Sequence, residues 1–342
     1  MSGGVDSSVS AALLVEQGYN VHGVSLRMWE GERGPRVCSD HRGAAEVAAH
    51  LGIPHTLLDL REQFAETVVK PFAQDYLHGR TPNPCVACNR DFKLGTLLGW
   101  AKEHDAEFVA TGHYANVVHD QKAKRAALLR GADRGKDQSY FLFALSQQQL
   151  AHTLFPLGAM QKTDVRAKAR ALGLPAAERP ESQDICFGDY KALVASYAKQ
   201  DEIRGGDVVD RAGKVLGQHG GVHTVTVGQR RGLGIAAAEP LYVVDIDDQS
   251  KRVVVGHKAD LKCAGLIARW VNWLEEPAAE IETEVQIRYR APAVACKIRP
   301  EPDGACEVHF TEPLTAVTPG QAAVFYRSER VLGGGWIVRA LR

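Results

Sequence analysis

A glycine-containing segment near the start of the chain has the residue types that bind a phosphate. Residues 2–8 read SGGVDSS and run directly into a stretch with helical periodicity. Glycines let a backbone approach an anion closely, and the start of a helix adds free N–H groups and a positive dipole. The serine hydroxyls can donate to phosphate oxygens, whereas Asp6 needs a divalent metal between itself and a phosphate. For two glycines alone, a capped helix start is the simpler interpretation.

Two further segments carry cysteines in polar surroundings. Residues 81–89 read TPNPCVACN, with Cys85 and Cys88 just before a helix expected from Asp91, and residues 182–187 read SQDICF around Cys186. A thiol at the start of a helix has a lowered pKa and is more nucleophilic at neutral pH. The default role of a cysteine is that of a small buried hydrophobe. We assign that default role to Cys263, Cys296 and Cys306, and no role to Cys38.

The first 195 residues or so alternate short apolar runs with helical patterns. This alternation predicts a parallel sheet covered on both faces, which binds ligands at the carboxyl ends of its strands. Gly18 and Gly52 stand where two of the helices should end, and Pro71 is expected to bend or interrupt a third. The predicted strands are 21–26, 55–60 and 108–111, and the predicted helices are 8–17, 43–51, 61–76 and 91–104.

From about residue 200 the chain becomes rich in short β-type segments separated by turns. This pattern predicts an all-β region, either one barrel or two small β units. We place a soft boundary near Lys258, where strand signals give way to a mixed segment. The predicted strands are 207–210, 223–227, 242–246, 252–255, 284–289, 295–298, 306–310, 322–326 and 336–338.

The composition is that of an ordinary globular protein. Among 342 residues, 41 Lys and Arg balance 41 Asp and Glu, and 45% are hydrophobic, which excludes a disordered, collagen-like or basic-tail protein. We find no run of about 20 apolar residues and no signal peptide, so the cysteines indicate a reducing, cytoplasmic location without a membrane. Nucleic-acid binding would need local basic faces. The candidates are 120–136, 162–170 and 286–299, although each by itself is more often a solvated surface.

Several motifs together resemble one known family. The segment SGGVDS is similar to the pyrophosphate loop of the PP-loop ATP pyrophosphatases, and GRTPNPCVACN, TGHYA, KDQSYFL, FPLG, SQDICF and GQRRGLGI follow along the chain. In this combination the chain resembles the bacterial tRNA-specific 2-thiouridylases (MnmA/TrmU type) over nearly its whole length. The implied fold is α/β + β: a PP-loop, adenine nucleotide α-hydrolase-like parallel-sheet domain at 1–197, a small central β domain at 198–257 and a C-terminal, tRNA-contacting β-barrel at 258–342.

The resemblance implies an ATP-dependent 2-thiolation of the wobble uridine, position 34, of tRNA. ATP, with Mg²⁺, adenylates the uracil 2-oxo oxygen, and a persulfide on Cys186 supplies the sulfur. Cys88 is then the nucleophile that forms a transient disulfide with Cys186. The implied partners are tRNAs for lysine, glutamate and glutamine and an upstream persulfide or sulfur-relay donor protein.

The resemblance also assigns the binding residues by motif. ATP contacts are expected from Ser2, Gly3, Gly4, Val5, Asp6, Ser7, Ser8, Leu26 and Gly112. Contacts with tRNA, the target base included, are expected from Asn83, Pro84, Cys85, His113, Lys136, Asp137, Gln138, Arg288, Tyr289 and Gln321. Because the base must leave its stack to reach a buried sulfur, we expect it to be flipped.

The chain departs from the family pattern at two places. The family has a buried strand before the glycine loop, where this chain has only Met1; its absence is expected to weaken folding and ATP binding. Many members have aspartate at the position of Cys85. With Cys88 and Cys186, this third thiol could bind an iron–sulfur cluster that leaves one iron position open, or it could be a spare or resolving thiol.

Two other functions are compatible with the same residues. One is another adenylating PP-loop enzyme acting on a small molecule, which the β-rich C-terminal third and the paired cysteines disfavour. The other is a non-catalytic iron–sulfur or redox binding protein on this fold.

Overall fold

A computed structural model describes residues 1–29, 40–120, 125–180 and 190–342. The chain divides into two compact units, each described here by itself. The first comprises the described residues within 1–68, 85–188 and 329–331, and the second comprises those within 69–84, 189–328 and 332–342.

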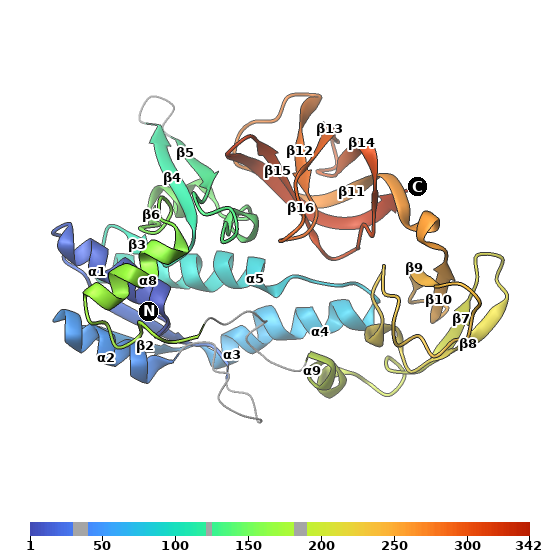
Figure 1. The fold of residues 1–342 in the computed structure, drawn as a ribbon, viewed down its shortest axis with the longest axis horizontal. Coiled ribbons are helices and arrows are strands. Elements are labelled where there is room, and N and C mark those ends of the chain that lie inside the picture. Colours follow the sequence, from blue (N-terminus) through green and yellow to red (C-terminus); the bar gives the residue numbers. More distant parts are fainter. Residues whose placement is uncertain (30–39, 121–124, 181–189) are drawn as a thin grey trace. The chain divides into compact units, whose positions relative to one another are not determined.

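The first unit contains the three strands that the alternating pattern predicts, and a further strand at 153–154 that it did not (Figure 1). Within the described residues they form two parallel two-stranded sheets where one sheet was predicted. Strand β1 (Gly23–Arg27) pairs in parallel with β2 (His55–Asp59), and β3 (Val109–Ala110) pairs in parallel with β6 (Thr153–Leu154). The hairpin of β4 (Ala115–Asp120) and β5 (Arg125–Arg130), which sequence patterning missed, is antiparallel.

Helices of the first unit begin and end largely where the sequence signals place them. Helix α1 (Val5–Glu16) is followed by Gly18 at a φ of 84°, and α2 (His41–Leu51) ends on Gly52 at a φ of 67°. The side chain of Asp40 caps the start of α2 by accepting from the Gly43 N–H at 3.0 Å. The remaining helical segments are α3 (Arg61–Phe64), η1 (Ala65–Val69), α5 (Pro84–Ala87), η2 (Cys88–Thr96), α6 (Leu97–Glu103), η3 (Ser139–Phe141), α7 (Gln147–Ala151) and α8 (Lys162–Ala171).

The core of the first unit fixes α8 against α1. Val5 and Val9 of α1 pack with Val165 and Ala169 of α8, all of them buried. Tyr114, from the TGHYA motif, joins the same cluster and is 2% exposed. This packing places the start of α8 beside the start of α1, directly after the glycine loop.

The second unit begins with α4 (Lys70–Leu77), and Pro71 stands in its first turn, directly after the π-helical segment η1. The α-helix predicted over 61–76 is therefore interrupted near Pro71, where a proline cannot donate the hydrogen bond of a helix interior. The small sheet has the strand order β8-β7-β10-β9, from β7 (Gly206–Val209), β8 (Val215–His219), β9 (Tyr242–Asp247) and β10 (Arg252–Gly256). The other helical segments are α9 (Tyr190–Tyr197), η4 (Val222–Thr224) and η5 (Lys258–Leu261).

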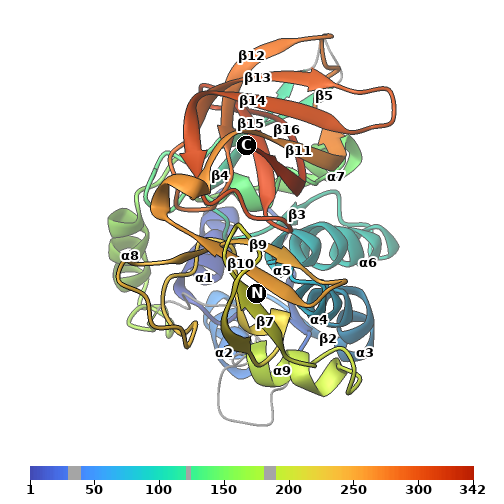
Figure 2. The same cartoon turned by 90° about the vertical axis from the view of Figure 1, so that its right-hand side faces the viewer.

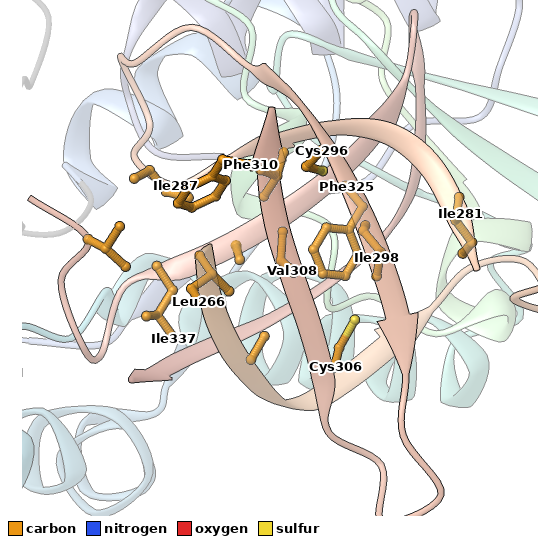
Figure 3. Packing of buried hydrophobic residues seen from close by; sticks show 14 of the residues in the cluster. Leu266, Ile281, Ile287, Cys296, Ile298, Cys306, Val308, Phe310, Phe325 and Ile337 are labelled. Atoms are coloured by element: carbon orange, nitrogen blue, oxygen red, sulfur yellow. The ribbon is translucent and has the colours of Figure 1, made fainter. Parts of the chain in front are cut away.

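Six antiparallel strands form a closed C-terminal barrel (Figure 2). Their order is β11-β14-β13-β12-β15-β16, and β11 pairs with β16 to complete the circle. The interior is apolar, with Leu266, Val308 and Phe325 each fully buried (Figure 3). The strands are β11 (Lys262–Trp273), β12 (Ile281–Gln286), β13 (Val294–Pro300), β14 (Cys306–Thr315), β15 (Ala322–Arg327) and β16 (Arg330–Leu341).

Two β predictions were wrong. Strand β11 fills the segment that we expected to be mixed. Three register shifts and Trp270 at a φ of 52° interrupt the alternation of side chains that marks a strand, which explains why the pattern missed it. The predicted strand 223–227 is instead a short 3₁₀ turn followed by a loop.

We predict that Leu266→Ala destabilises the barrel by about 2–5 kcal/mol, because it leaves a cavity in a fully closed core. Hydrogen exchange of peptides from β11, β14 and β16, followed by mass spectrometry, measures the loss of protection. Trp270→Ala in the same strand is the control, since that side chain is 69% exposed. Equal protection in wild type and Leu266→Ala would contradict the packing described here.

Candidate active site

The glycine loop has a shape that only glycine permits at one position. Gly3 has a φ of 75°, and a Cβ on it would lie 2.4 Å from the carbonyl oxygen of Asp40. The hydroxyls of Ser7 and Ser8 donate to the carbonyl of Gly4 at 3.1 Å and 2.9 Å. The loop is therefore held in a fixed turn before α1, with serine hydroxyls gathered around it.

Gly112 of the TGHYA motif lies directly against the first turn of α1. A Cβ at this position would be 2.8 Å from the backbone of both Asp6 and Ser7. The structure therefore places Gly112 beside the glycine loop, and its contact with ATP stays a prediction. Leu26, the other expected ATP contact outside the loop, is buried near the carboxyl end of β1.

The Asp6 carboxylate accepts hydrogen bonds from two side chains to which the sequence assigned no role. Its Oδ1 accepts from Lys162 Nζ at 2.6 Å and from the hydroxyl of Tyr114 at 2.8 Å. We expected the basic segment 162–170 to be a solvated surface, and this is wrong for Lys162, whose side chain is only 10% exposed. Lys162 stands at the start of a helix, on the face that packs against α1, and this position could have indicated that its side chain is buried.

Cys88 lies buried at the carboxyl end of β1. Its Sγ is 3.9 Å from Sδ of Met28, the residue directly after that strand. The expected helix N-terminus at Cys88 is wrong: the helical segment begins at Pro84, so Cys85 is in its first turn and Cys88 is inside it. Proline is favoured at the first helical position because its missing N–H would be unpaired there.

The helix that carries Cys88 is π-helical over Cys88–Thr96, and one side chain supports it. Gln149 Nε2 donates to the carbonyls of Arg90 and Leu94 at 2.6 Å and 3.1 Å, while its Oε1 accepts from the Ser146 N–H at 2.8 Å. A π-helix widens the turn, which changes the carbonyl pairing, and such segments are frequent at functional sites. Gln149 thus helps to set the backbone that positions Cys88.

His113 is a buried, neutral imidazole. Its Nδ1 lies 2.8 Å from the hydroxyl of Thr111, and the ring meets Phe155 edge-on. Burial, together with the nearby charge of Lys93, lowers the pKa of His113 to about 3. The side chain can therefore exchange neutral hydrogen bonds with a base but carries no charge at physiological pH.

Two residues of the KDQ motif hold their own loop together. Asp137 accepts from the Gly131 and Ser139 N–H groups at 2.9 Å and 3.1 Å, and from Arg130 at 3.0 Å. Gln138 exchanges two hydrogen bonds with the backbone of Tyr114, at 2.8 Å and 3.1 Å. Direct contact of Lys136, Asp137 and Gln138 with tRNA stays a prediction.

In the second unit, several expected tRNA contacts gather at one place on the barrel. Gln321 Nε2 donates to the carbonyl of Thr81 at 2.6 Å, and the Thr81 N–H donates to Pro319 at 2.9 Å. Arg288 donates to Thr318 at 2.8 Å. The segment that leads into Asn83 and Pro84 is thus tied to the barrel beside Gln321 and near the turn of Arg288 and Tyr289.

Cys186 and Cys38 lie outside the described residues. The chain before Cys186 is anchored, however, because Arg179 donates to the carbonyl of Gly3 at 3.0 Å and pairs with Asp40. Within the described residues there is no group of three or more His, Cys, Asp or Glu side chains that could hold a metal. The cluster expected at Cys85, Cys88 and Cys186 therefore remains a prediction.

The default role that we assigned to the barrel cysteines is confirmed. Cys263, Cys296 and Cys306 are all buried in the barrel core. Burial raises the pKa of both Cys296 and Cys306 to about 12. Their thiolates are scarce at neutral pH, which leaves them chemically inert.

We predict that iodoacetamide at about pH 8 alkylates half-buried Cys85 at least about 100-fold faster than Cys296 or Cys306, because only about one in ten thousand of the barrel thiols is ionised at that pH. Peptide mass spectrometry over time measures each rate. In urea all cysteines should react at similar rates. Equal labelling of barrel and helix thiols in the folded protein would refute the prediction.

We predict that the His113 ring does not titrate between about pH 5 and about pH 8, measured by NMR of its Cε1–H. Its folded pKa, about 3, lies below the ordinary value of 6.5, so the unfolded chain takes up the proton first. The free energy of unfolding should therefore fall as the pH drops below about 6.5. The His113→Asn variant should lose less of its free energy of unfolding than wild type does between neutral and acid pH. A titration near 6.5 would overturn this assignment.

Family models match the chain in three consecutive pieces. Residues 1–189 match the tRNA methyl transferase HUP domain, 192–257 the tRNA methyl transferase PRC-barrel domain, and 263–337 the aminomethyltransferase beta-barrel domain. The HUP model alone covers more than half of the chain. None of the described helices is both long and apolar enough to span a membrane.

Full-length relatives are similar along the whole chain. The tRNA-specific 2-thiouridylase MnmA of Geotalea uraniireducens (strain Rf4) is 48% identical over 355 residues, covering 100% of this chain and 94% of the relative. The enzymes of that name from Syntrophotalea carbinolica and Geobacter metallireducens are 49% and 47% identical, over 98% and 100% of this chain and 97% and 96% of the relatives.

Proposed function

Because the chain belongs to the tRNA-specific 2-thiouridylase MnmA family, we propose that it is a tRNA-uridine 2-sulfurtransferase that converts ATP to AMP and diphosphate. The observation that carries the proposal is a convergence on two neighbouring elements of the first unit. Gly112 packs on the first turn of α1, and Cys88 reaches Met28 at the end of β1, two residues beyond Leu26.

The reaction begins with activation of the uracil 2-oxo oxygen, which is a poor leaving group. Transfer of AMP from ATP to this oxygen releases diphosphate and lets AMP depart in the later step. The glycine loop, with its serine hydroxyls and the start of α1, suits the phosphates. Asp6 fits Mg²⁺, since this ion binds through one or two carboxylates plus substrate phosphates instead of a protein cage. When bound, Mg²⁺ would offset phosphate charge there.

Sulfur arrives as a persulfide on Cys186. The Cys88 thiolate attacks Sγ of Cys186, which forms the Cys88–Cys186 disulfide and expels hydrosulfide; hydrosulfide then adds to C2 of the activated uracil and AMP leaves. A two-electron reductant restores both thiols. The position of Arg179 supports this step. Arg179 is anchored at Gly3, and Cys186 follows it by seven residues, which span at most about 25 Å even when fully extended.

On the tRNA side, residues of each unit are proposed as contacts. In the second unit, Gln321 and the Asn83–Pro84 segment are proposed to meet the flipped base, while Arg288 contacts phosphate and Tyr289 stacks. In the first unit, His113, Lys136, Asp137 and Gln138 are proposed to contact tRNA as well. We propose tRNAs for lysine, glutamate and glutamine as substrates, a persulfide-carrying donor protein, a cytoplasmic location, and domain boundaries at 197 and 257.

Cys85 has two proposed roles that the same measurement separates. It stands three positions before Cys88, so both thiols lie on neighbouring turns of one helical segment. With Cys186 it could hold an iron–sulfur cluster, or it could resolve the disulfide. Anaerobic iron and sulfide analysis decides: about four irons per chain favours the cluster, and none favours the resolving thiol.

We predict that purified protein with Mg·ATP, a persulfide donor and unmodified tRNA forms AMP and 2-thiouridine together, and that Cys186→Ala abolishes thiolation and protein persulfide while leaving tRNA binding unchanged. Mass spectrometry of digested tRNA and filter binding are the measurements. Cys38→Ala, a cysteine without an assigned role, is the matched control.

Three results would count against the proposal. Full thiolation by Cys186→Ala with a persulfide donor would remove the sulfur carrier. AMP formation that needs a small molecule in place of tRNA would indicate another adenylating enzyme. Bound iron and sulfide without any AMP formation would indicate a non-catalytic redox protein.

A further inference from the structure

One buried cation in the first unit has no role in the function proposed above. Lys162 is the first residue of α8, and its ammonium lies 2.6 Å from Asp6 Oδ1 and 5.7 Å from the centre of the Tyr114 ring. The same carboxylate oxygen accepts from the Tyr114 hydroxyl. The Lys162 side chain is 10% exposed, whereas that of Asp6 is 33% exposed and lies in the first turn after the glycine loop.

A second ion pair between the same two helices shows what an ordinary structural contact looks like. Lys168 of α8 pairs with Glu16 of α1 at 2.8 Å, and these side chains are 32% and 43% exposed. Exposed pairs of this kind contribute little to stability. Burying a lysine is costly, and apolar residues would hold two helices together at least as well. A buried lysine at this end of α8 therefore indicates a task beyond helix packing.

The start of α8 is also fixed from the other side. The Lys162 N–H donates to Asp133 Oδ2 at 2.9 Å, and Asp133 Oδ1 accepts from the Gly135 N–H at 3.0 Å. The backbone of Lys162 is thus anchored to the loop that precedes the KDQ motif. With its backbone held and its side chain buried, the ammonium has few positions available other than beside Asp6.

We propose that Lys162 is a positioning residue for Mg·ATP, which orients the Asp6 carboxylate and offsets the negative charge of that carboxylate beside the glycine loop. The inference rests on the assignment of that loop to ATP. Without Lys162, the Asp6 carboxylate would lose the buried ammonium that lies 2.6 Å from its Oδ1. Oδ1 of Asp6 accepts hydrogen bonds from both Lys162 and Tyr114, and these two bonds fix the orientation of the carboxylate.

The test is direct binding of Mg·ATP to the full-length protein by isothermal titration calorimetry, without tRNA or turnover. Lys162→Met keeps the length of the side chain and removes its charge; it should weaken binding by roughly 10- to 100-fold, as expected for losing a charge-assisted contact. Lys168→Met is the matched control on the same helix and should change binding less than about twofold. Thermal unfolding shows whether each variant folds.

Further variants keep the test decisive if Lys162→Met folds poorly. Lys162→Arg retains the charge and should bind more tightly than Lys162→Gln. Tyr114→Phe removes the neutral donor to the same oxygen and should cost less than Lys162→Met. In a cycle with Asp6→Asn, the double variant should bind about as weakly as Asp6→Asn alone, because Lys162 acts through Asp6.

The outcomes separate this inference from the proposed function. The role of Lys162 would be overturned if wild type binds Mg·ATP and Lys162→Met binds it equally well, or if Lys162→Gln binds it as tightly as Lys162→Arg. Either result would leave the proposed function standing. A loss of thermal stability without a change in binding would show a purely structural lysine. Wild-type protein that does not bind Mg·ATP would overturn the ATP assignment itself.

Discussion

The candidate site depends on how closely other segments approach the first turn of α1. Gly112 reaches the backbone of Asp6 and Ser7 so closely that no side chain fits between them, and Gly3 meets Asp40 in the same way on the other side. These contacts need bare backbone, which only glycine offers. Two further side chains reach the same turn, since the Tyr114 hydroxyl donates to Asp6 and Arg179 donates to the Gly3 carbonyl.

Charge is distributed unevenly between buried and exposed positions. The chain has no net formal charge, and on the barrel Lys297 and Arg299 are paired with Glu280. The default interpretation of the basic segment 286–299 as a solvated surface therefore holds for these two residues. Arg288 in the same segment donates a hydrogen bond to Thr318 instead. The buried charges belong to the first unit, where Arg130 meets Asp137 and Lys162 meets Asp6. These two pairs lie where water is least available to screen them.

Sequence patterns predicted the elements whose signals are local. Gly18, Gly52 and the alternation of strand and helix located α1, α2, β1 and β2 to within a few residues. Motif spacing identified the glycine loop, Gly112 and Cys88, which the fold brings to α1 and β1. What failed depends on tertiary structure. Bulges hid β11, and the π-helix of Cys88 requires Gln149, a residue about 60 positions away.

Pairings across long sequence distances were out of reach for the same reason. No periodicity in the chain joins Lys162 to Asp6 or Gln321 to Thr81, because each pair is created by the packing of whole elements. Both Lys162 and Gln321 were visible only as members of a basic run or a family motif. In the structure the charge of Lys162 is buried, although the basic run predicted it at the surface.

The hydrogen bonds between Thr81 and the barrel have a mechanical consequence. Only Pro82 and Asn83 separate Thr81 from Pro84, the first residue of the helical segment that carries both Cys85 and Cys88. Two prolines in so short a connection leave little slack. The helical segment that carries Cys85 and Cys88 therefore starts within three residues of a point where the backbone is fixed to the barrel.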